Sequence, residues 1–174
     1  EQTISTTTYA ASTSGTQTLA VTQASQTITF GALANKTFGD PDFVISATAS
    51  SGLTVSFAAS GNCTITTATV HLTGAGNCTI TASQAGNASY LAATPVPQSF
   101  TTAKAPATLA LSGLAATFDG TPKPVTVTTT PANLTTVSVT YAGNATVPTT
   151  AGNYAIVASL TNDNYQATDA TGTL

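Results

Sequence analysis

Two stretches of this chain occur twice, and their spacing limits the size of any folded unit. Thr37–Pro41 (TFGDP) returns in variant form as Thr117–Pro122 (TFDGTP), about 80 residues later. Ala75–Ser83 returns as Ala151–Ser159 at a similar spacing. Each copy of the second stretch is followed by an asparagine-containing corner and a tyrosine. The repetition therefore predicts two successive units, each of about 75–80 residues.

The repeats divide the chain into an N-terminal extension (1–24), unit 1 (25–104) and unit 2 (105–174). The extension resembles the tail of a unit. At one constant offset, Tyr9 aligns with Tyr90, Gln17 with Gln98, Leu19 with Phe100 and Ala24 with Ala105. After Tyr165, unit 2 continues only to Leu174. We therefore expect unit 2 to lack most of its last strand and the extension to carry a spare copy of it.

Short alternating stretches of Thr with Val, Ile or Ala indicate an all-β fold. Thr64–Thr66, Thr79–Ala82 and Val125–Thr128 alternate with a period of two, and Gly, Pro and Asn interrupt such stretches throughout. Units of this size with about seven short strands fit an immunoglobulin-like Greek-key sandwich. The predicted architecture is two tandem immunoglobulin-like β-sandwiches with an N-terminal strand extension.

The low charge excludes several kinds of partner. Charged residues make up 5% of the chain, against about a quarter in ordinary domains. Its 3 basic residues cannot form a patch for nucleic acid, and the net charge of −3 does not favour anionic lipid. No apolar run approaches the ~20 residues that span a bilayer. We expect no nucleic acid and no membrane insertion, and, without a basic and hydrophobic leader, exported material whose signal has been removed.

The two cysteines lie in duplicated Gly-Asn-Cys-Thr-Ile segments of unit 1. We predict that Cys63 and Cys78 form a disulfide between two strands, as an even cysteine count in an exported protein favours. Closing a loop of ~15 residues contributes about 3 kcal/mol. Metal or redox chemistry would require more ligands or a closer pair, so we predict no cofactor and no metal.

No set of residues predicts catalysis, and we expect the protein not to be an enzyme. His71 is the only histidine, and Ser and Thr are too abundant for their proximity to signal a triad. Asp40, Asp42 or Asp163 could contribute oxygens to a calcium site, but calcium requires about six to eight ligands, so turn formation is favoured for them. Lys–Asn isopeptide bonds at Lys36, Lys104 or Lys123 would each need a buried carboxylate beside the pair, and acidic residues are scarce.

Asparagines and tyrosines supply the remaining candidate positions. Six Asn-X-Ser/Thr sequons are candidate glycosylation sites, although turn formation is favoured for them: Asn35, Asn62, Asn77, Asn87, Asn133 and Asn144. Tyr90 and Tyr165 each precede a closing strand, which predicts structural tyrosines whose hydroxyls bond back to the chain. A sugar-stacking role is the alternative for these two rings.

Several motifs resemble a known family. They are Gln26–Phe30, Gly39-Asp40, Gly61–Ile65, Gly76–Asn87 and Phe118–Val125. These stretches are similar to the MBG and related immunoglobulin-like repeats of bacterial secreted adhesins, with Phe118 where that family more often has Tyr. The resemblance runs from about Gln17 to the last residue. It implies a secreted, cell-surface protein of a stalk or adhesin; what it binds, host or surface glycans included, stays open.

The spare strand leads to an assembly hypothesis. Thr18, Leu19, Ala20, Val21 and Thr22 are the predicted donor strand, and Gly172, Thr173 and Leu174 are the predicted acceptor end. Burying Leu19 and Val21 would contribute about 1.5–3 kcal/mol each. One copy would complete unit 2 of the next, giving a pilus-like, head-to-tail filament of identical subunits. The alternatives are an excerpt of a long covalent repeat stalk and a ligand-binding adhesin domain.

Overall fold

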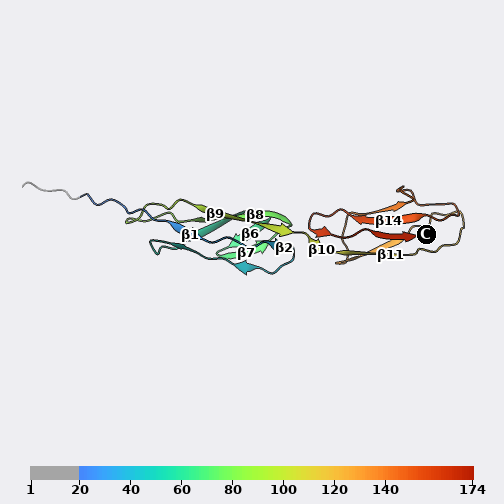
Figure 1. Ribbon diagram of the computed structural model, residues 1–174, viewed down its shortest axis with the longest axis horizontal. Helices are drawn as coiled ribbons and strands as arrows, with labels where there is room; N and C mark the ends of the chain where they lie inside the picture. The colour runs from blue at the N-terminus through green and yellow to red at the C-terminus, as the bar shows by residue number, and fades with distance from the viewer. Residues whose placement is uncertain (1–19) are drawn as a thin grey trace, which may run out of the picture.

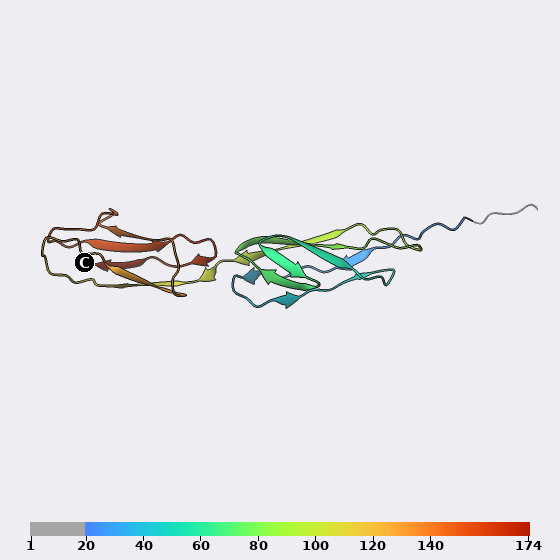
Figure 2. The same ribbon diagram turned by 180° about the vertical axis from the view of Figure 1, so that it is seen from behind.

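The computed structural model describes residues 20–174, which form two β-sheet units placed end to end along an extended rod (Figure 1). The same end-to-end arrangement is plain from behind (Figure 2). Residues 20–174 contain strands and no helix, so no helix in that range could cross a membrane. The all-β fold class is confirmed. Val, Thr and Ile at alternating positions explain it, since such side chains suit a pleated, half-buried surface.

Unit 1 is a two-layer sandwich. One layer has the strand order β2-β9-β8-β5, and β3-β7-β6 together with the β1-β4 pair form the other. Its strands are β1 (Ile28–Phe30), β2 (Lys36–Thr37), β3 (Phe43–Val44), β4 (Ala47–Ala49), β5 (Ser56–Gly61), β6 (Cys63–Thr66), β7 (Thr69–Leu72), β8 (Gly76–Ser83) and β9 (Val96–Ala103). β2 pairs parallel with β9, and the other pairs are antiparallel.

The core of unit 1 lies between these layers. Val70, Ile80 and Phe100 are among its fully or almost fully buried side chains. A disulfide joins Cys63 of β6 to Cys78 of β8, as the sequence predicts, and so connects one layer to the other. Both cysteines are buried in the same cluster, which makes the bridge part of the core.

Unit 2 has a shorter version of the same arrangement. Its strands are β10 (Ala105–Pro106), β11 (Thr108–Ser112), β12 (Thr126–Thr130), β13 (Val137–Tyr141), β14 (Ala155–Leu160), β15 (Tyr165–Gln166) and β16 (Ala170–Thr173). β11 pairs with β12 as β1 pairs with β4. The order β13-β14-β16 matches β5-β8-β9. Tyr154 stands at the repeat position of Cys78, so this unit has a tyrosine where unit 1 has its disulfide.

Unit 2 does not have the gap that the sequence predicts at its last strand. β16 pairs antiparallel with β14, from Ala158↔Ala170 to Ala155↔Thr173. Leu174 continues this ladder, because it exchanges main-chain hydrogen bonds of 2.9 and 3.0 Å with Tyr154. The predicted acceptor residues Gly172, Thr173 and Leu174 are therefore themselves the closing strand. The prediction failed because it compared β16 with the full length of β9.

Gly172 shows that β16 is fitted to this position. A Cβ atom built on it would lie 3.0 Å from Cδ1 and 3.2 Å from Cδ2 of Leu114. The register with β14 places Gly172 at the position of Gln98 in unit 1. The extension has Gln17 at the same repeat position, where a side chain would require the end of the Leu114 side chain to move by a few tenths of an ångström. Glycine at this position thus lets β16 lie close to Leu114.

Candidate assembly site

The two units meet at a junction built from side chains of both. The rings of Phe38 in unit 1 and Tyr165 in unit 2 lie edge to face, with centroids 5.6 Å apart and planes at 88°. Beside them, the main-chain N–H of Ala75 donates a 2.9 Å hydrogen bond to Oδ1 of Asn164. Edge-to-face packing is a favoured geometry for aromatic rings. The junction therefore joins the units by apolar packing and a hydrogen bond as well as by the chain.

The chain crosses this junction as a continuous extended segment. β9 ends at Ala103, and β10 begins at Ala105 and pairs parallel with β15. The N–H of Ala105 donates to the carbonyl of Asn164 at 2.8 Å, and the Lys104 ammonium donates to the carbonyl of Asn162. The chain thus passes from the closing strand of one unit to the first strand of the next with only Lys104 between them.

An asparagine turn positions the tyrosine of the junction. Oδ1 of Asn162 accepts hydrogen bonds from the N–H groups of Asn164 (2.9 Å) and Tyr165 (3.0 Å). Asparagine is suited to this role because its side chain mimics a backbone carbonyl two residues on. We call this corner, together with Lys104 and Ala105, the head end of unit 2. The turns around Phe38 and Ala75 are the tail end of unit 1.

Unit 1 has a head end of the same construction. Oδ1 of Asn87 accepts from the N–H groups of Ser89 (2.8 Å) and Tyr90 (3.0 Å). Ala24 bridges Tyr90 in parallel, as Ala105 does Tyr165. Nε2 of Gln23 donates to the carbonyl of Asn87 at 2.6 Å, in the place of Lys104. The head end of unit 1 therefore has the same kinds of hydrogen bond as the junction.

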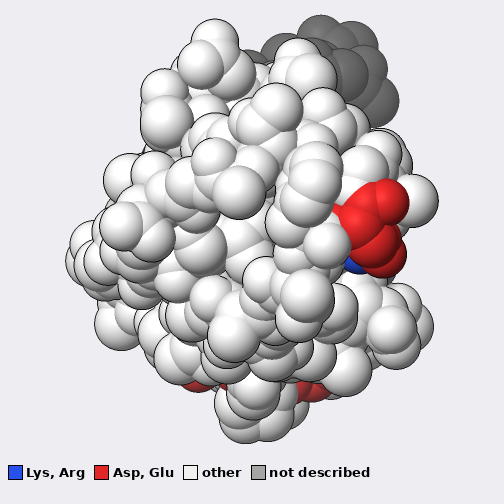
Figure 3. Space-filling view, turned by 90° about the vertical axis from the view of Figure 1, so that its right-hand side faces the viewer, with Lys and Arg blue, Asp and Glu red and all other residues white. Residues whose placement is uncertain are grey.

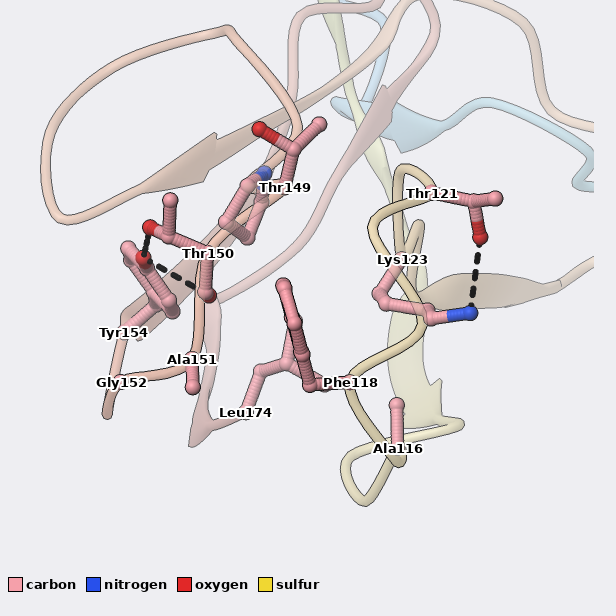
Figure 4. A pocket seen from close by; sticks show the side chains of 11 residues that line it. Ala116, Phe118, Thr121, Lys123, Thr149, Thr150, Ala151, Gly152, Tyr154 and Leu174 are labelled. Atoms are coloured by element: carbon pink, nitrogen blue, oxygen red, sulfur yellow. Dashed lines mark hydrogen bonds between the residues drawn. The ribbon is translucent and has the colours of Figure 1, made fainter.

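Unit 2 has the matching tail end. Phe118, the repeat counterpart of Phe38, is 62% exposed. It borders a cavity of about 130 Å³ whose lining includes Ala116, Gly152, Tyr154 and Leu174. Figure 4 shows Phe118 and Leu174 at its centre, with Tyr154 and Lys123 on opposite sides. Sequence reasoning missed this role of Phe38 and Phe118, although the repeated TFGDP and TFDGTP turns contain both.

Charge is almost absent from this tail end. Seen end-on, the surface is mostly uncharged, with an acidic group and a basic group beside it at the right and more acidic atoms at the lower edge (Figure 3). The Lys123 ammonium lies 2.6 Å from Oδ2 of Asp119, and the Thr121 N–H donates to Oδ1 at 2.9 Å. The hydrogen bond from Lys123, followed by those from Thr121, lowers the pKa of Asp119 well below its usual range. This pair fixes the turn that follows Phe118.

The predicted donor strand lies partly outside the described residues. Thr18 and Leu19 fall there, while Ala20, Val21 and Thr22 are exposed and belong to no strand. Val21 is 87% exposed. The first pairing of the extension with unit 1 is the bridge at Ala24. The structure thus brings the extension to the head end of its own unit 1, and its role as a donor remains a prediction.

The two predicted structural tyrosines have a different role from the expected one. Within residues 20–174, the hydroxyls of Tyr90 and Tyr165 make no hydrogen bond, and Tyr165 acts instead through its ring at the junction. Two other tyrosines have hydroxyls that bond back to the chain. Oη of Tyr154 donates to the carbonyl of Thr150 at 3.1 Å. Tyr141 is buried, and its Oη accepts a 3.0 Å hydrogen bond from the N–H of Val125.

Most other candidates have structural contacts. His71 lies on β7 with Nδ1 2.7 Å from Oδ1 of Asp42, and both side chains are exposed. Oδ2 of Asp40 accepts from the Thr37 N–H at 2.9 Å, and the Lys36 ammonium lies 4.6 Å from the Phe43 ring centroid. No group of three or more metal-ligating side chains occurs in the described part of the chain.

The sequon asparagines lie in exposed positions, and several have main-chain contacts. Nδ2 of Asn62 donates to the carbonyl of Ala75, and Nδ2 of Asn144 donates to that of Ala142 at 3.3 Å. Oδ1 of Asn35 accepts from the Thr101 N–H at 2.9 Å. The remaining three are Asn77, beside Thr101, Asn87, in the corner above, and Asn133, which has a positive φ. These contacts fit the turn role.

Comparison with known proteins identifies the second unit. Residues 107–174 match the family model of the MBG domain, which confirms the resemblance for that part of the chain. MBG domains occur in surface-associated proteins, and the match indicates a repeat of the surface-adhesin type. No curated protein matches the chain.

Proposed function

From the MBG-type second unit, we propose that this chain is a structural rod segment of a secreted bacterial surface fibre or stalk, without enzymatic activity. The observation that carries the proposal is the junction, where Phe38 packs on Tyr165 and β9 continues into β10. Each feature restricts bending between the units. A protein made of such units gains length with every repeat, which is what a surface stalk requires.

The composition supports a role as a structural spacer rather than as a ligand-binding domain. The surface is rich in Thr and Ser and has few charges, so it offers little for specific electrostatic recognition. The cavity of unit 2 lies at its tail end, where Phe118 and Leu174 border it (Figure 4). Contacts in that position suit another unit of the rod better than a ligand bound from the side.

The rod is testable by ¹⁵N relaxation of the purified chain. We expect both units to share one anisotropic rotational correlation time, because the junction holds them together. Two shorter and independent correlation times would contradict the rod. The control is a chain in which a flexible Gly/Ser linker replaces Lys104, since this separates the units without changing either core.

A second candidate is the donor-strand filament of identical subunits. The specific observation in its favour is that Gln23 and Ala24 sit on the Asn87 corner as Lys104 and Ala105 sit on the Asn162 corner. In the junction, the residues before Lys104 belong to the closing strand of the preceding unit. By analogy with that arrangement, we propose in this second candidate that residues before Gln23 join the tail end of unit 2 in another copy.

Sedimentation velocity over a concentration series tests this candidate. The full chain is expected to form a ladder of head-to-tail oligomers, and a chain of residues 25–174 is expected to stay monomeric. If both chains sediment as monomers at all concentrations, separate copies do not polymerise, and the covalent stalk is the remaining form of the proposal.

A further inference from the structure

The chain enters unit 1 and leaves it at opposite ends. Gln23 and Ala24 lie at the head end, where Ala24 bridges Tyr90, and β9 ends at Ala103 beside the junction. The strands of unit 1 run along the rod between these two ends (Figure 1). A pull along the rod therefore acts on the entering segment toward the head end and on β9 toward the tail end.

The entering segment and the leaving strand are hydrogen-bonded directly to each other. β2 pairs parallel with β9, with Lys36 opposite Thr102 and Thr37 opposite Ala103. The N–H of Phe38 donates to the carbonyl of Ala103 at 2.9 Å. An early strand of unit 1 is thus joined to its last strand, although the two are far apart in sequence.

A side chain lengthens this pairing by one residue. The N–H of Thr101 donates to Oδ1 of Asn35 at 2.9 Å, where a longer strand would offer a main-chain carbonyl. Both residues are exposed, so this contact lies at the surface of the unit. We call residues 35–38 and 101–103 together the β2–β9 patch.

The direction of the two strands decides how the β2–β9 patch responds to tension. Both strands run toward the tail end, because they are parallel. Tension pulls β2 back toward the head end and β9 onward toward the tail end, so the strands must slide past one another along their own axes. All hydrogen bonds of the patch are then loaded at once. Strands pulled apart from one end would instead lose these bonds one at a time, at lower force.

The patch also determines which residues carry the load. While it holds, tension passes from β2 directly into β9 and bypasses residues 39–100. These residues include most of the buried core and the Cys63–Cys78 bridge. The core is therefore loaded only after the patch has broken, which makes the patch the barrier to extension of unit 1.

Burial supports the inner side of the patch. Thr102 is 2% exposed, and the neighbouring Phe100 is 3% exposed. The Lys36 side chain, opposite Thr102, extends over the ring of Phe43, with its ammonium 4.6 Å from the ring centroid. A hydrogen bond is stronger where water is excluded, so this packing makes the paired strands harder to separate.

The load path continues into unit 2 with the same geometry. Beyond Lys104, β10 pairs parallel with β15. The N–H groups of Ala105 and Ala107 donate to the carbonyls of Asn164 and Gln166, each at 2.8 Å. The strand that leaves the β2–β9 patch is thus hydrogen-bonded again as soon as it enters the next unit.

We infer that unit 1 bears tensile load along the rod and that the β2–β9 patch is the element that resists its extension. This inference rests on the proposed role as a rod segment and adds a mechanical function to it. The load enters at Gln23 and leaves at Lys104, so the role belongs to unit 1 by itself.

Single-molecule force spectroscopy of the full chain, held by handles at its two ends, tests this role. We expect unit 1 to extend in one abrupt step when the patch breaks. Dithiothreitol is then added while the chain is held extended. Reduction of Cys63–Cys78, which have a sequence separation of 15, should lengthen the chain by roughly 50 Å more. This additional lengthening identifies the abrupt step as that of unit 1.

Two variants separate the patch from the rest of unit 1. Asn35→Ala removes the acceptor of the Thr101 N–H, and at a given force it should make unit 1 unfold at least about threefold faster. Ser56→Ala is the matched control. It removes an exposed side-chain hydrogen bond of 3.1 Å to the carbonyl of Ser83, between β5 and β8. Because these strands lie outside the load path, the unfolding rate under force should not change.

The outcomes distinguish the patch from the rod. Gradual lengthening of unit 1 at low force, or equal unfolding rates in the two variants, would overturn the load-bearing role of the patch. The rod is tested without force, by ¹⁵N relaxation. Equal rates together with one shared correlation time would contradict the patch and leave the rod standing. Faster unfolding of Asn35→Ala alone, together with two independent correlation times, would support the patch and contradict the rod.

Discussion

The ring of Phe38 meets that of Tyr165 edge to face at 5.6 Å across the boundary between two sheet units. Phe38 comes from a turn of unit 1, and Tyr165 is held by the Asn162 corner of unit 2. The contact therefore joins a turn that recurs around Phe118 to an asparagine corner that recurs at Asn87. It also explains why the two units form a rod.

Removing the aromatic contact should loosen the junction without unfolding the units. For Phe38→Ala we expect a loss of about 0.5–1.5 kcal/mol from the ring pair, in addition to lost burial. Small-angle scattering and ¹⁵N relaxation should show wider bending between the units, with each unit's amide signals otherwise unchanged. Phe118→Ala, at the same repeat position, is the matched control and should not alter bending within a chain. Unchanged rigidity in Phe38→Ala would contradict this role.

The disulfide should stabilise unit 1 alone. The double variant Cys63→Ala, Cys78→Ala opens a loop with a sequence separation of 15 and should lower the free energy of unfolding of unit 1 by about 3 kcal/mol. Urea unfolding followed by NMR signals of both units measures this, with unit 2 as the internal control. Equal destabilisation of the two units would show that they unfold together.

The fit of β16 is testable at Gly172. Gly172→Val places side-chain atoms against Leu114, which lies 3.0 Å from the position of a Cβ, so unit 2 should lose about 1–3 kcal/mol through overpacking. Amide exchange in β14 reports the loss. The adjacent, exposed Thr173→Val is the control and should have little effect. If the amides of β14 exchanged as slowly in the Gly172→Val variant as in the unchanged chain, β16 would not be packed against Leu114 as described.

The buried tyrosine should matter through its hydroxyl. Tyr141→Phe leaves the N–H of Val125 without its 3.0 Å partner, and an unpaired buried donor costs about 1–3 kcal/mol. Thermal or urea unfolding of unit 2 measures the change. Tyr90→Phe, which removes a hydroxyl without a hydrogen bond in the described structure, should be neutral. A larger loss of stability in Tyr90→Phe than in Tyr141→Phe would instead support the hydroxyl hydrogen bond predicted for Tyr90.

The Asp119–Lys123 pair gives a pH prediction. Lys123 is the largest cause of the lowered pKa of Asp119, so Lys123→Ala should move that pKa up toward 3.8. A depressed carboxyl pKa stabilises the fold above 3.8, and this contribution is lost as the pH falls toward the folded value. NMR titration of the Asp119 carboxyl measures the shift, with Lys104→Ala as the control. Because the pair is exposed, stability near neutral pH should change little. An Asp119 titration that is the same in Lys123→Ala would contradict this contact.

Sequence patterns were sufficient for the features that the repeats preserve. Alternation predicted the strands around Ile65, Ile80 and Val127, which lie in β6, β8 and β12. The duplicated Gly-Asn-Cys segments predicted the cysteine pair. The asparagine corners before Tyr90 and Tyr165 were recognised as equivalent, and their hydrogen bonds are the same.

The assembly site was less accessible from sequence because it depends on contacts between units. The alignment that matched Leu19 with Phe100 did not reveal that Leu174 already holds this position beside Tyr154. The close approach of Gly172 to Leu114 joins two residues that are distant in sequence. Likewise, both tyrosines were expected to act through hydroxyls, whereas the ring of Tyr165 faces a phenylalanine of the preceding unit. Packing partners of this kind follow from the three-dimensional arrangement.

Electron microscopy of the purified chain tests the central claim most directly, namely that the contact between Phe38 and Tyr165 holds the two units as one rod. The account predicts particles in which unit 1 and unit 2 keep a single end-to-end orientation, whether the copies are separate or joined. Particles in which the two units adopt many different angles to one another would contradict it.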